Sequence, residues 1–291
     1  MVKLLAEDAC AKINLFLRVT GRRADGYHQL DSIFVPISIS DRITVEIRPA
    51  PAATVSIRCD LPSLGDPESN LAMRAARAYL TEFGISAQVT IDLQKVIPVG
   101  AGLGGGSSDA GTVLRMMSSM ISTRPASDVS ARLKNLAVGL GADVPFFLDP
   151  RPARVTGVGE VIAPFDRFPT LHLVVAVPNV EVPTASVFKA LQPDHWSGAA
   201  SDRDIDAILR GEVSGTPLIN DLEAPAIALY PQIAKLKMLL QECGASAASM
   251  SGSGGAVFGI FPDANAAAHA SERLRIKAPE AKVLVTESKT G

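Results

Sequence analysis

Hydrophobic and polar residues alternate along three segments in the first third of the chain. These segments span residues 12–19, 41–48 and 87–93. Successive side chains of a β-strand point to opposite faces, so this period of two predicts three strands. In the first strand, the polar Lys12 and Asn14 share one face, and the other face carries Ile13, Leu15, Leu17 and Val19.

A helical period of about 3.6 residues predicts three helices in the same part of the chain. The first spans residues 71–83, and Asn70 is a suitable cap residue before it. The second begins after Ser107 or Ser108, and the third spans residues 128–140.

The order of strands and helices begins again after about residue 165. Strands are predicted at residues 172–177, 256–261 and 282–287, and helices at 231–242 and 264–276. The elements are mixed without a regular βαβ alternation, which favours an α+β fold over a doubly wound parallel sheet. We therefore predict two domains, residues 1–165 and 166–291, with a soft boundary because no linker separates them.

Composition and charge argue against several classes of protein. The chain of 291 residues carries 28 basic and 30 acidic side chains, a net charge of −2, which gives no reason to expect nucleic acid or a membrane as partner. Its three cysteines form no Cys-x-x-Cys pair, so we expect neither disulfides nor a zinc site, and a cytoplasmic location fits. No apolar run approaches the ~18 residues that span a bilayer, and residues 1–11 do not resemble a signal peptide.

The strongest chemical signal is a glycine-rich segment, Pro98–Gly111. Five glycines fall between positions 100 and 106, between a predicted strand and a predicted helix. Glycines let successive backbone N–H groups approach an anion, and the following helix adds its positive dipole end. The segment therefore predicts a phosphate-binding loop, in which Ser107 and Ser108 can cap the helix, contact a phosphate oxygen or help to hold Mg²⁺.

Two common nucleotide motifs fit this segment poorly. A G-x-G-x-x-G match is present, but Asp128, which stands where that motif needs an acidic residue about 20 positions later, opens a helix instead of ending a strand. No lysine follows the glycines, as it would in GxxxxGK[ST]. A lysine from elsewhere must then help to neutralise a bound triphosphate.

Asp143 and Lys12 are further candidates with ordinary alternatives. Asp143 lies in a mostly apolar stretch before a proline, where a carboxylate must be capping, paired or catalytic. Lys12 stands near the start of an apolar strand, where a lysine is often a solvated edge residue. Neither position is decisive alone.

Three segments together resemble the motifs of the GHMP kinase superfamily: Ala11–Leu17, Pro98–Gly111 and Met250–Gly255. Within it, segments such as Arg23–His28 and Gly139–Pro145 are similar to the kinases of the non-mevalonate isoprenoid pathway that act on a cytidine diphosphate-linked methylerythritol. The resemblance covers nearly the whole chain. It implies a ribosomal protein S5 domain 2-like N-terminal domain, a ferredoxin-like C-terminal domain, and ATP-dependent phosphorylation with Mg²⁺.

The resemblance also implies roles for single residues. Asp143 would take the proton of the substrate 2-hydroxyl, and Lys12 would orient Asp143 and offset charge on the transferred phosphoryl group. Substrate contacts are expected from Tyr27 and Phe188 on the faces of the cytosine ring, His28 at the base edge, and Asn14 and Thr184 near the methylerythritol or diphosphate. Nucleotide contacts are expected from Asn70 and Lys95 on the adenosine side and from Pro98, Gly100, Gly102, Leu103, Gly104, Gly105, Gly106, Ser107 and Ser108.

Some features and alternatives stay open. Asp109 stands where asparagine or alanine is common, and it adds a negative charge near the phosphates while favouring the helix N-terminus. Mg²⁺ is expected to arrive with ATP, because no acidic residue stands out as a metal ligand. The alternatives are a GHMP-type kinase for another small alcohol and a non-catalytic ligand sensor of the same fold. We expect a monomer or a weak homodimer.

Overall fold

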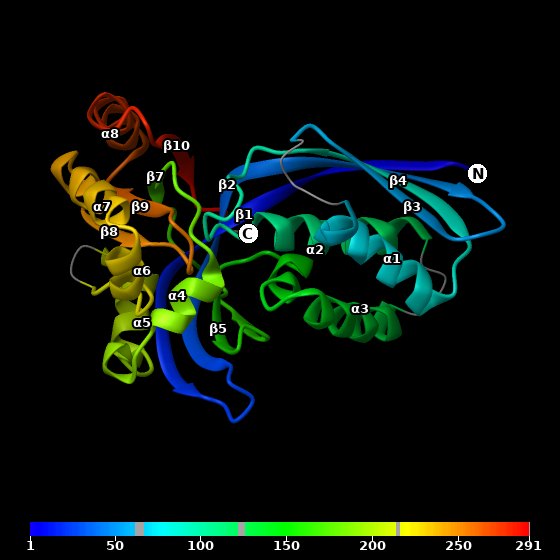
Figure 1. The fold of residues 1–291 in the computed structure, drawn as a ribbon, viewed down its shortest axis with the longest axis horizontal. Coiled ribbons are helices and arrows are strands. Elements are labelled where there is room, and N and C mark those ends of the chain that lie inside the picture. The colour runs from blue at the N-terminus through cyan, green and yellow to red at the C-terminus, as the bar shows by residue number, and fades with distance from the viewer. Residues whose placement is uncertain (62–66, 122–125, 214–215, 291) are drawn as a thin grey trace. The chain divides into compact units, whose positions relative to one another are not determined.

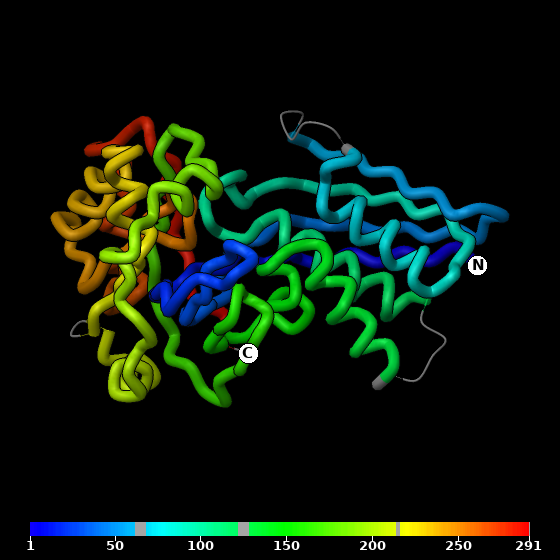
Figure 2. The backbone as a smooth tube through the Cα atoms, turned by 60° about the horizontal axis from the view of Figure 1, so that its bottom comes forward, coloured from blue at the N-terminus to red at the C-terminus, as the bar shows by residue number. Residues whose placement is uncertain are grey.

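The computed structural model describes residues 1–61, 67–121, 126–213 and 216–290 and contains two compact units (Figure 1). Unit 1 comprises residues 1–11, 39–99 and 104–150, and unit 2 comprises residues 12–38, 100–103 and 151–291. The long strands β1 (Lys3–Arg22) and β2 (His28–Pro49), blue in Figure 2, pair with each other and have residues in both units.

Unit 1 places three helices on one side of a small sheet (Figure 1). The strand β4 (Ala87–Gln94) pairs antiparallel with the second half of β2 and parallel with β3 (Thr54–Cys59). The helices are α1 (Leu71–Phe83), α2 (Gly105–Ile121) and α3 (Ala126–Leu140), and the 3-10 helices are η2 (Pro67–Ser69) and η3 (Val144–Leu148).

The helix α1 confirms its predicted bounds and its cap. The Asn70 side chain accepts a hydrogen bond from the Ala72 N–H at 2.9 Å, which satisfies one of the unpaired donors at the helix start. Gly84 ends the helix with a φ of 63°, a left-handed conformation that favours glycine.

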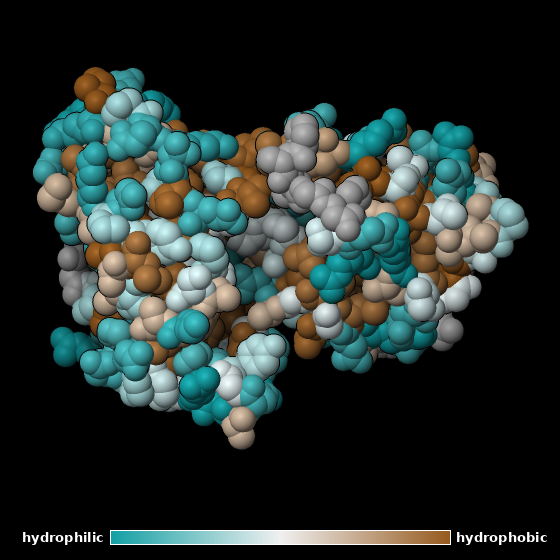
Figure 3. Space-filling model, viewed as in Figure 1, coloured by the Kyte–Doolittle hydropathy of each residue, from teal (hydrophilic) through white to brown (hydrophobic). Residues whose placement is uncertain are grey.

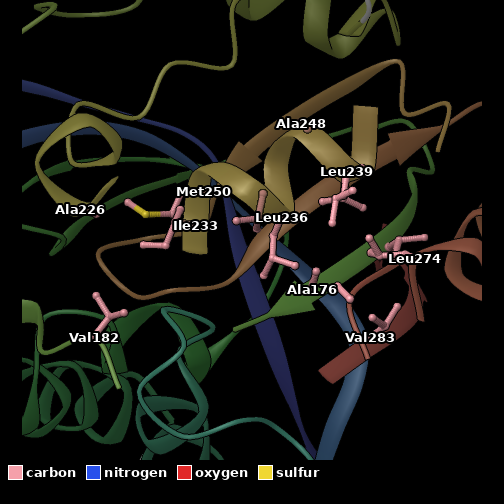
Figure 4. Packing of buried hydrophobic residues seen from close by; sticks show 14 of the residues in the cluster. Ala176, Val182, Ala226, Ile233, Leu236, Leu239, Ala248, Met250, Leu274 and Val283 are labelled. Carbon is pink, nitrogen blue, oxygen red and sulfur yellow. The ribbon is translucent and has the colours of Figure 1, made fainter. Parts of the chain in front are cut away.

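Unit 2 contains a four-stranded antiparallel sheet in the order β10-β7-β9-β8. Its strands are β7 (His172–Val177), β8 (Ala247–Met250), β9 (Val257–Phe261) and β10 (Lys282–Glu287). The helices α7 (Gln232–Glu242) and α8 (Ala264–Lys277) pack on it. Figure 4 shows Leu236, Leu239 and Leu274 of these helices in one hydrophobic cluster with Ala176 of β7. Burying one such leucine contributes about 1.5–3 kcal/mol.

Unit 2 also contains the first half of β2. That half pairs antiparallel with β5 (Ala153–Gly157), which pairs with β6 (Val161–Pro164). The helices are α4 (Thr184–Ala190), η4 (Pro193–His195), α5 (Asp202–Leu209) and α6 (Glu223–Leu229). This mixture of helices with largely antiparallel strands confirms the predicted α+β class.

The surfaces of both units mix polar and apolar residues over short distances, on the face that Figure 3 displays. Within the described ranges, no helix combines the length and apolar character that crossing a membrane requires.

Candidate active site

The first part of the glycine-rich loop, Gly100–Leu103, lies in unit 2 against the late glycine-rich turn, Met250–Gly255. The Ser251 hydroxyl donates a hydrogen bond to the Gly102 carbonyl at 3.1 Å. Gly102 has a φ of 77°, and a Cβ there would overlap the Ser251 carbonyl oxygen. Glycine is required for so close an approach of two backbones, so the two glycine-rich motifs form one packed structure.

Lys12 and Asn14 of β1 join this structure. The Lys12 N–H donates to the Leu103 carbonyl at 2.9 Å, and the Asn14 N–H donates to the Ser251 hydroxyl at 3.2 Å. The Lys12 ammonium donates to Asn14 Oδ1 and lies 4.6 Å from the centre of the Phe34 ring. Lys12 is only 3% exposed, so the solvated-edge interpretation is excluded.

The second part of the loop, residues 104–108, begins α2 in unit 1. The Ser108 N–H donates to the Gly104 carbonyl at 2.8 Å, so the helix starts at Gly105 and both serines lie in its first turn instead of capping it. The Ser108 side chain is buried, and its hydroxyl donates to the Cys10 carbonyl at 2.7 Å. Ser107 is partly exposed, which makes it the better placed of the two for contacting a phosphate.

Lys95 lies beside the start of α2. Its ammonium donates to the Asp109 carboxylate at 2.7 Å and also to Asp41, and a Cβ on Gly105 would lie 3.5 Å from its Nζ. Asp41 also accepts the backbone N–H groups of residues 96 and 97, at 2.6 and 2.9 Å. Asp41 therefore fixes both Lys95 and the chain that leads into the glycine-rich loop.

The ion pair with Lys95 offsets only part of the cost of burying a charged Asp109 carboxylate. Burial raises the pKa of Asp109 to about 7, because attraction to Lys95 offsets only part of the desolvation and Asp41 adds repulsion. Its Oδ1 atom is buried and has no hydrogen-bond partner. Burial lowers the pKa of Lys95, but the two carboxylates outweigh that effect, so the pKa of Lys95 is raised.

We expect the Asp109 carboxyl to destabilise the folded protein as the pH rises. Its pKa is about 7 in the folded state against 3.8 ordinarily, so the folded protein holds this proton more tightly than the unfolded chain does. The resulting contribution to the free energy of unfolding is complete below pH 3.8 and is lost as the pH rises through 7. Asp109→Asn should remove this loss. The free energy of unfolding of the variant, relative to the unmodified protein, should rise by on the order of 1–3 kcal/mol from about pH 4 to pH 8.

Urea denaturation at several pH values checks this expectation. The control is Asp92→Asn, because the Asp92 side chain is 46% exposed in its ion pair with Arg58. Parallel stability curves for the Asp109 variant and the unmodified protein would contradict the raised pKa.

Asp143 precedes η3 in unit 1. Its side chain makes no capping hydrogen bond to that helix, so Asp143 is not a helix cap. Two interpretations remain for this carboxylate: a partner in a polar pair, or a catalytic group. The helix η3 packs closely on α2, because a Cβ on Gly111 would lie 2.6 Å from the Phe147 Cβ. Gly111 thus allows the close approach that positions Asp143.

Three aromatic side chains of unit 2 lie together: His28, Phe188 and Trp196. We call them the aromatic cluster. His28 stacks on Phe188 with 5.4 Å between ring centroids, and Trp196 meets His28 edge-on at 6.0 Å. Burial lowers the pKa of His28, with a further contribution from Arg22, which favours the neutral ring that can both donate and accept hydrogen bonds. Tyr27, which precedes His28 in the chain, is 66% exposed.

The helix α4 connects this cluster to the late glycine-rich turn. It carries Thr184 and Phe188, which are one helical turn apart and therefore share a face. The Ser253 hydroxyl of the late turn donates to the Thr184 hydroxyl at 2.8 Å. The structure thus adds Ser253 and Trp196 to the candidate residues. The sequence analysis did not select Trp196. The one signal for it is that it is the single tryptophan of the chain.

The candidate residues are divided between the units. Unit 1 holds Asp143, Asn70, Lys95, Pro98 and residues 104–108, and unit 2 holds Lys12, Asn14, Tyr27, His28, Thr184, Phe188 and residues 100–103. Within unit 2, Lys12 is hydrogen-bonded to Asn14, and His28 stacks on Phe188. Among the residues that the structure describes, no group of three or more His, Cys, Asp or Glu is arranged to hold a metal ion.

Comparison with protein families gives two matches. Residues 70–149 match the GHMP kinases N terminal domain, and residues 199–280 match the GHMP kinases C terminal domain. The matches lie on either side of residue 165, where the domain boundary stays a prediction.

Similar proteins and structures narrow the family. A 4-diphosphocytidyl-2-C-methyl-D-erythritol kinase of Anaeromyxobacter sp. (strain K) is 41% identical over 93% of this chain and 85% of its own length. One of Symbiobacterium thermophilum is 40% identical over 95% and 97%. A crystal structure of 4-(cytidine 5'-diphospho)-2C-methyl-D-erythritol kinase is 37% identical, with a TM-score of 0.83 over 99% of this chain and 100% of the other. A homoserine kinase from Cytophaga hutchinsonii shares the fold, with a TM-score of 0.70 at 17% identity. The chain therefore belongs to the 4-diphosphocytidyl-2-C-methyl-D-erythritol kinase family of the GHMP kinases.

Proposed function

We propose that this protein transfers the γ-phosphoryl group of ATP to the 2-hydroxyl of 4-diphosphocytidyl-2-C-methyl-D-erythritol, a step of the non-mevalonate isoprenoid pathway. The observation that carries the proposal is the likeness, over nearly the full length of both chains, to a kinase of this substrate at 37% identity. Phosphoryl transfer needs mainly positioning and electrostatic stabilisation, and a glycine-rich loop with buried lysines suits both.

Asp143 and Lys12 are the proposed catalytic residues. Asp143 accepts the proton of the substrate hydroxyl, as a carboxylate beside the reacting oxygen can. Lys12 offsets the charge that develops on the transferred phosphoryl group. Its ammonium already interacts with Asn14 and the Phe34 ring, so it is held in one place before substrate binds. Prior positioning means that little reorganisation is needed in the transition state.

The proposed nucleotide site uses the glycine-rich loop and Lys95. Backbone N–H groups at the start of α2 and the Ser107 hydroxyl contact phosphate oxygens. Lys95, which the resemblance places on the adenosine side, holds its Nζ near Gly105 at the start of α2. Bound ATP would bring Mg²⁺, which would neutralise phosphate charge and keep several waters.

The proposed cytidine site is the aromatic cluster with Tyr27. Flat aromatic faces suit a planar base, and a neutral His28 can hydrogen-bond the base edge. Thr184 lies one turn of α4 from Phe188. That spacing suits a ligand whose base and diphosphate are bound by the same helix.

ADP release on mixing the protein with ATP and candidate alcohols tests the proposal. The panel contains the cytidine-linked methylerythritol, sugars, homoserine and mevalonate. We expect ADP release only with the cytidine substrate. Release with another alcohol alone would replace the proposed substrate, and ATP binding without any release would favour a ligand sensor.

Tyr27→Ala is expected to weaken binding of the cytidine substrate. Loss of one face of the base site should raise the KM for that substrate about tenfold and leave the KM for ATP nearly unchanged. Steady-state kinetics with each substrate varied in turn measures both values. The control is Tyr230→Ala, which removes a tyrosine from the C-terminal end of α6. A raised KM for ATP alone would place Tyr27 on the nucleotide side.

A further inference from the structure

Asn220 and Asp221 are adjacent buried residues of unit 2, 7% and 5% exposed, and the proposed reaction does not use them. They lie beside β1, where the Leu17 N–H donates to the Ile219 carbonyl and the Asp221 N–H donates to the Leu17 carbonyl, both at 2.9 Å. Asn220 and Leu17 form a parallel bridge. Asp221 begins a turn, in which the Glu223 N–H donates to the Asn220 carbonyl at 2.9 Å.

The Asn220 side chain holds the late glycine-rich turn. Its Nδ2 donates to the Met250 carbonyl at 2.8 Å and to the Gly252 carbonyl at 2.9 Å. Its Oδ1 accepts the Leu222 N–H at 2.9 Å, so the amide has a fixed orientation. Gly252 has a φ of 60°, and a Cβ there would lie 3.0 Å from the Gly102 carbonyl oxygen. Asn220 therefore fixes a turn that packs directly against the glycine-rich loop.

The Asp221 side chain holds the segment that follows Trp196. Its Oδ2 accepts the Val19 N–H at 2.6 Å, and the N–H and hydroxyl of Ser197 at 3.0 and 3.1 Å. Hydrogen bonds to an ionised carboxylate are stronger than those between neutral groups. Since Ser197 directly follows Trp196, these bonds fix the position from which Trp196 meets His28.

We propose that Asn220 and Asp221 are positioning residues that serve the two ends of the substrate separately. Asn220 positions the late turn and, through it, the glycine-rich loop for phosphoryl transfer. Asp221 positions the aromatic cluster for recognition of the cytosine ring. The inference rests on the proposed function, because it requires a substrate with a base at one end and the reacting hydroxyl at the other.

Kinetic constants separate the two roles. Asp221→Asn removes the negative charge that strengthens the three hydrogen bonds to Oδ2, so we expect the KM for the cytidine substrate to rise about tenfold while kcat changes less than about twofold. Asn220→Asp places a carboxylate against two carbonyl oxygens, so we expect kcat to fall about tenfold with the KM for the cytidine substrate nearly unchanged. The control is Asp206→Asn, which changes an exposed aspartate of α5.

Trp196 offers a second readout, because it is the single tryptophan of the chain. Its fluorescence reports on the aromatic cluster and should respond to added cytidine diphosphate. We expect Asp221→Asn to shift the emission of the free protein and to weaken cytidine diphosphate binding about tenfold. Asn220→Asp should leave both unchanged. A purely structural role for the two residues would not give opposite patterns in adjacent variants.

The milder variant Ser197→Ala keeps the test decisive if Asp221→Asn fails to fold. It removes one of the three hydrogen bonds to Asp221 and should raise the same KM by a smaller factor. Equal changes of kcat and KM in both variants, or no change in either, would overturn the inference while the unmodified protein stays active. Inactivity of the unmodified protein on the cytidine substrate would instead overturn the proposed function and this inference with it.

Discussion

Asp143→Asn is expected to lower kcat by about a thousandfold while ATP still binds, since a general base contributes about 10²–10⁴ in rate. The amide has nearly the shape of the carboxylate but cannot take the proton of the substrate hydroxyl. The side chain does not cap η3, so the substitution should not unfold that helix. Single-turnover kinetics measures the transfer step, and calorimetric titration with ATP measures binding.

The matched control is Asp149→Asn, at the other end of the same 3-10 helix. It changes the same functional group at an exposed position and should retain nearly full turnover. Turnover near that of the unmodified protein in the Asp143 variant would show that another group accepts the proton. If the Asp143 variant loses both ATP binding and turnover, Asp143 has a structural role.

Local signals in the sequence were sufficient for several elements. The predicted strands at residues 172–177 and 282–287 agree with β7 and β10 to the residue, and the predicted helix 71–83 agrees with α1. The helix α1 has a clear helical period, with a cap residue and a terminal glycine at its ends, and the two strands are short apolar runs rich in valine. Such signals depend on neighbouring residues, so no tertiary contact is needed to read them.

The long first half of β2 could not be read in this way. Residues 31–37 are all buried, so the strand lacks the alternation that marks a half-buried strand, and Pro36 interrupts it further. The strand β1 was predicted only in part, at residues 12–19, and residues 9–19 are buried on both faces. Lys12 therefore looked like a possible edge residue, whereas it is enclosed.

The site shows the same limit. The sequence indicates that a lysine outside the glycine-rich loop must help with the triphosphate, but the pairing of Lys95 with Asp41 and Asp109 joins residues up to 54 positions apart. The opposing effects of Asp109 could not be weighed without that pairing. Asn220 and Trp196 carry no local motif, and their contacts with the late turn and with His28 exist only in the folded chain.

Gly254→Ala is expected to disrupt the nucleotide site. A Cβ at Gly254 would overlap the backbone of Ala101 and Gly102 and lie 2.8 Å from the Ala101 carbonyl oxygen. Backbone atoms cannot rotate away as a flexible side chain can, so the glycine-rich loop and the late turn must separate. Overpacking of this kind costs about 1–3 kcal/mol of stability. Displacing a positioning element by about 1 Å can lower the rate about a hundredfold.

The measurement is kcat/KM for ATP together with the free energy of unfolding. We expect kcat/KM to fall about a hundredfold, well beyond the fraction of protein unfolded. The control is Gly139→Ala in α3, where a Cβ meets nothing within 4 Å and alanine favours the helix. That variant should keep full activity and gain slightly in stability. If Gly254→Ala keeps nearly full activity, the close packing of the two glycine-rich motifs serves stability alone, and the phosphate site must depend on the start of α2 and Lys95.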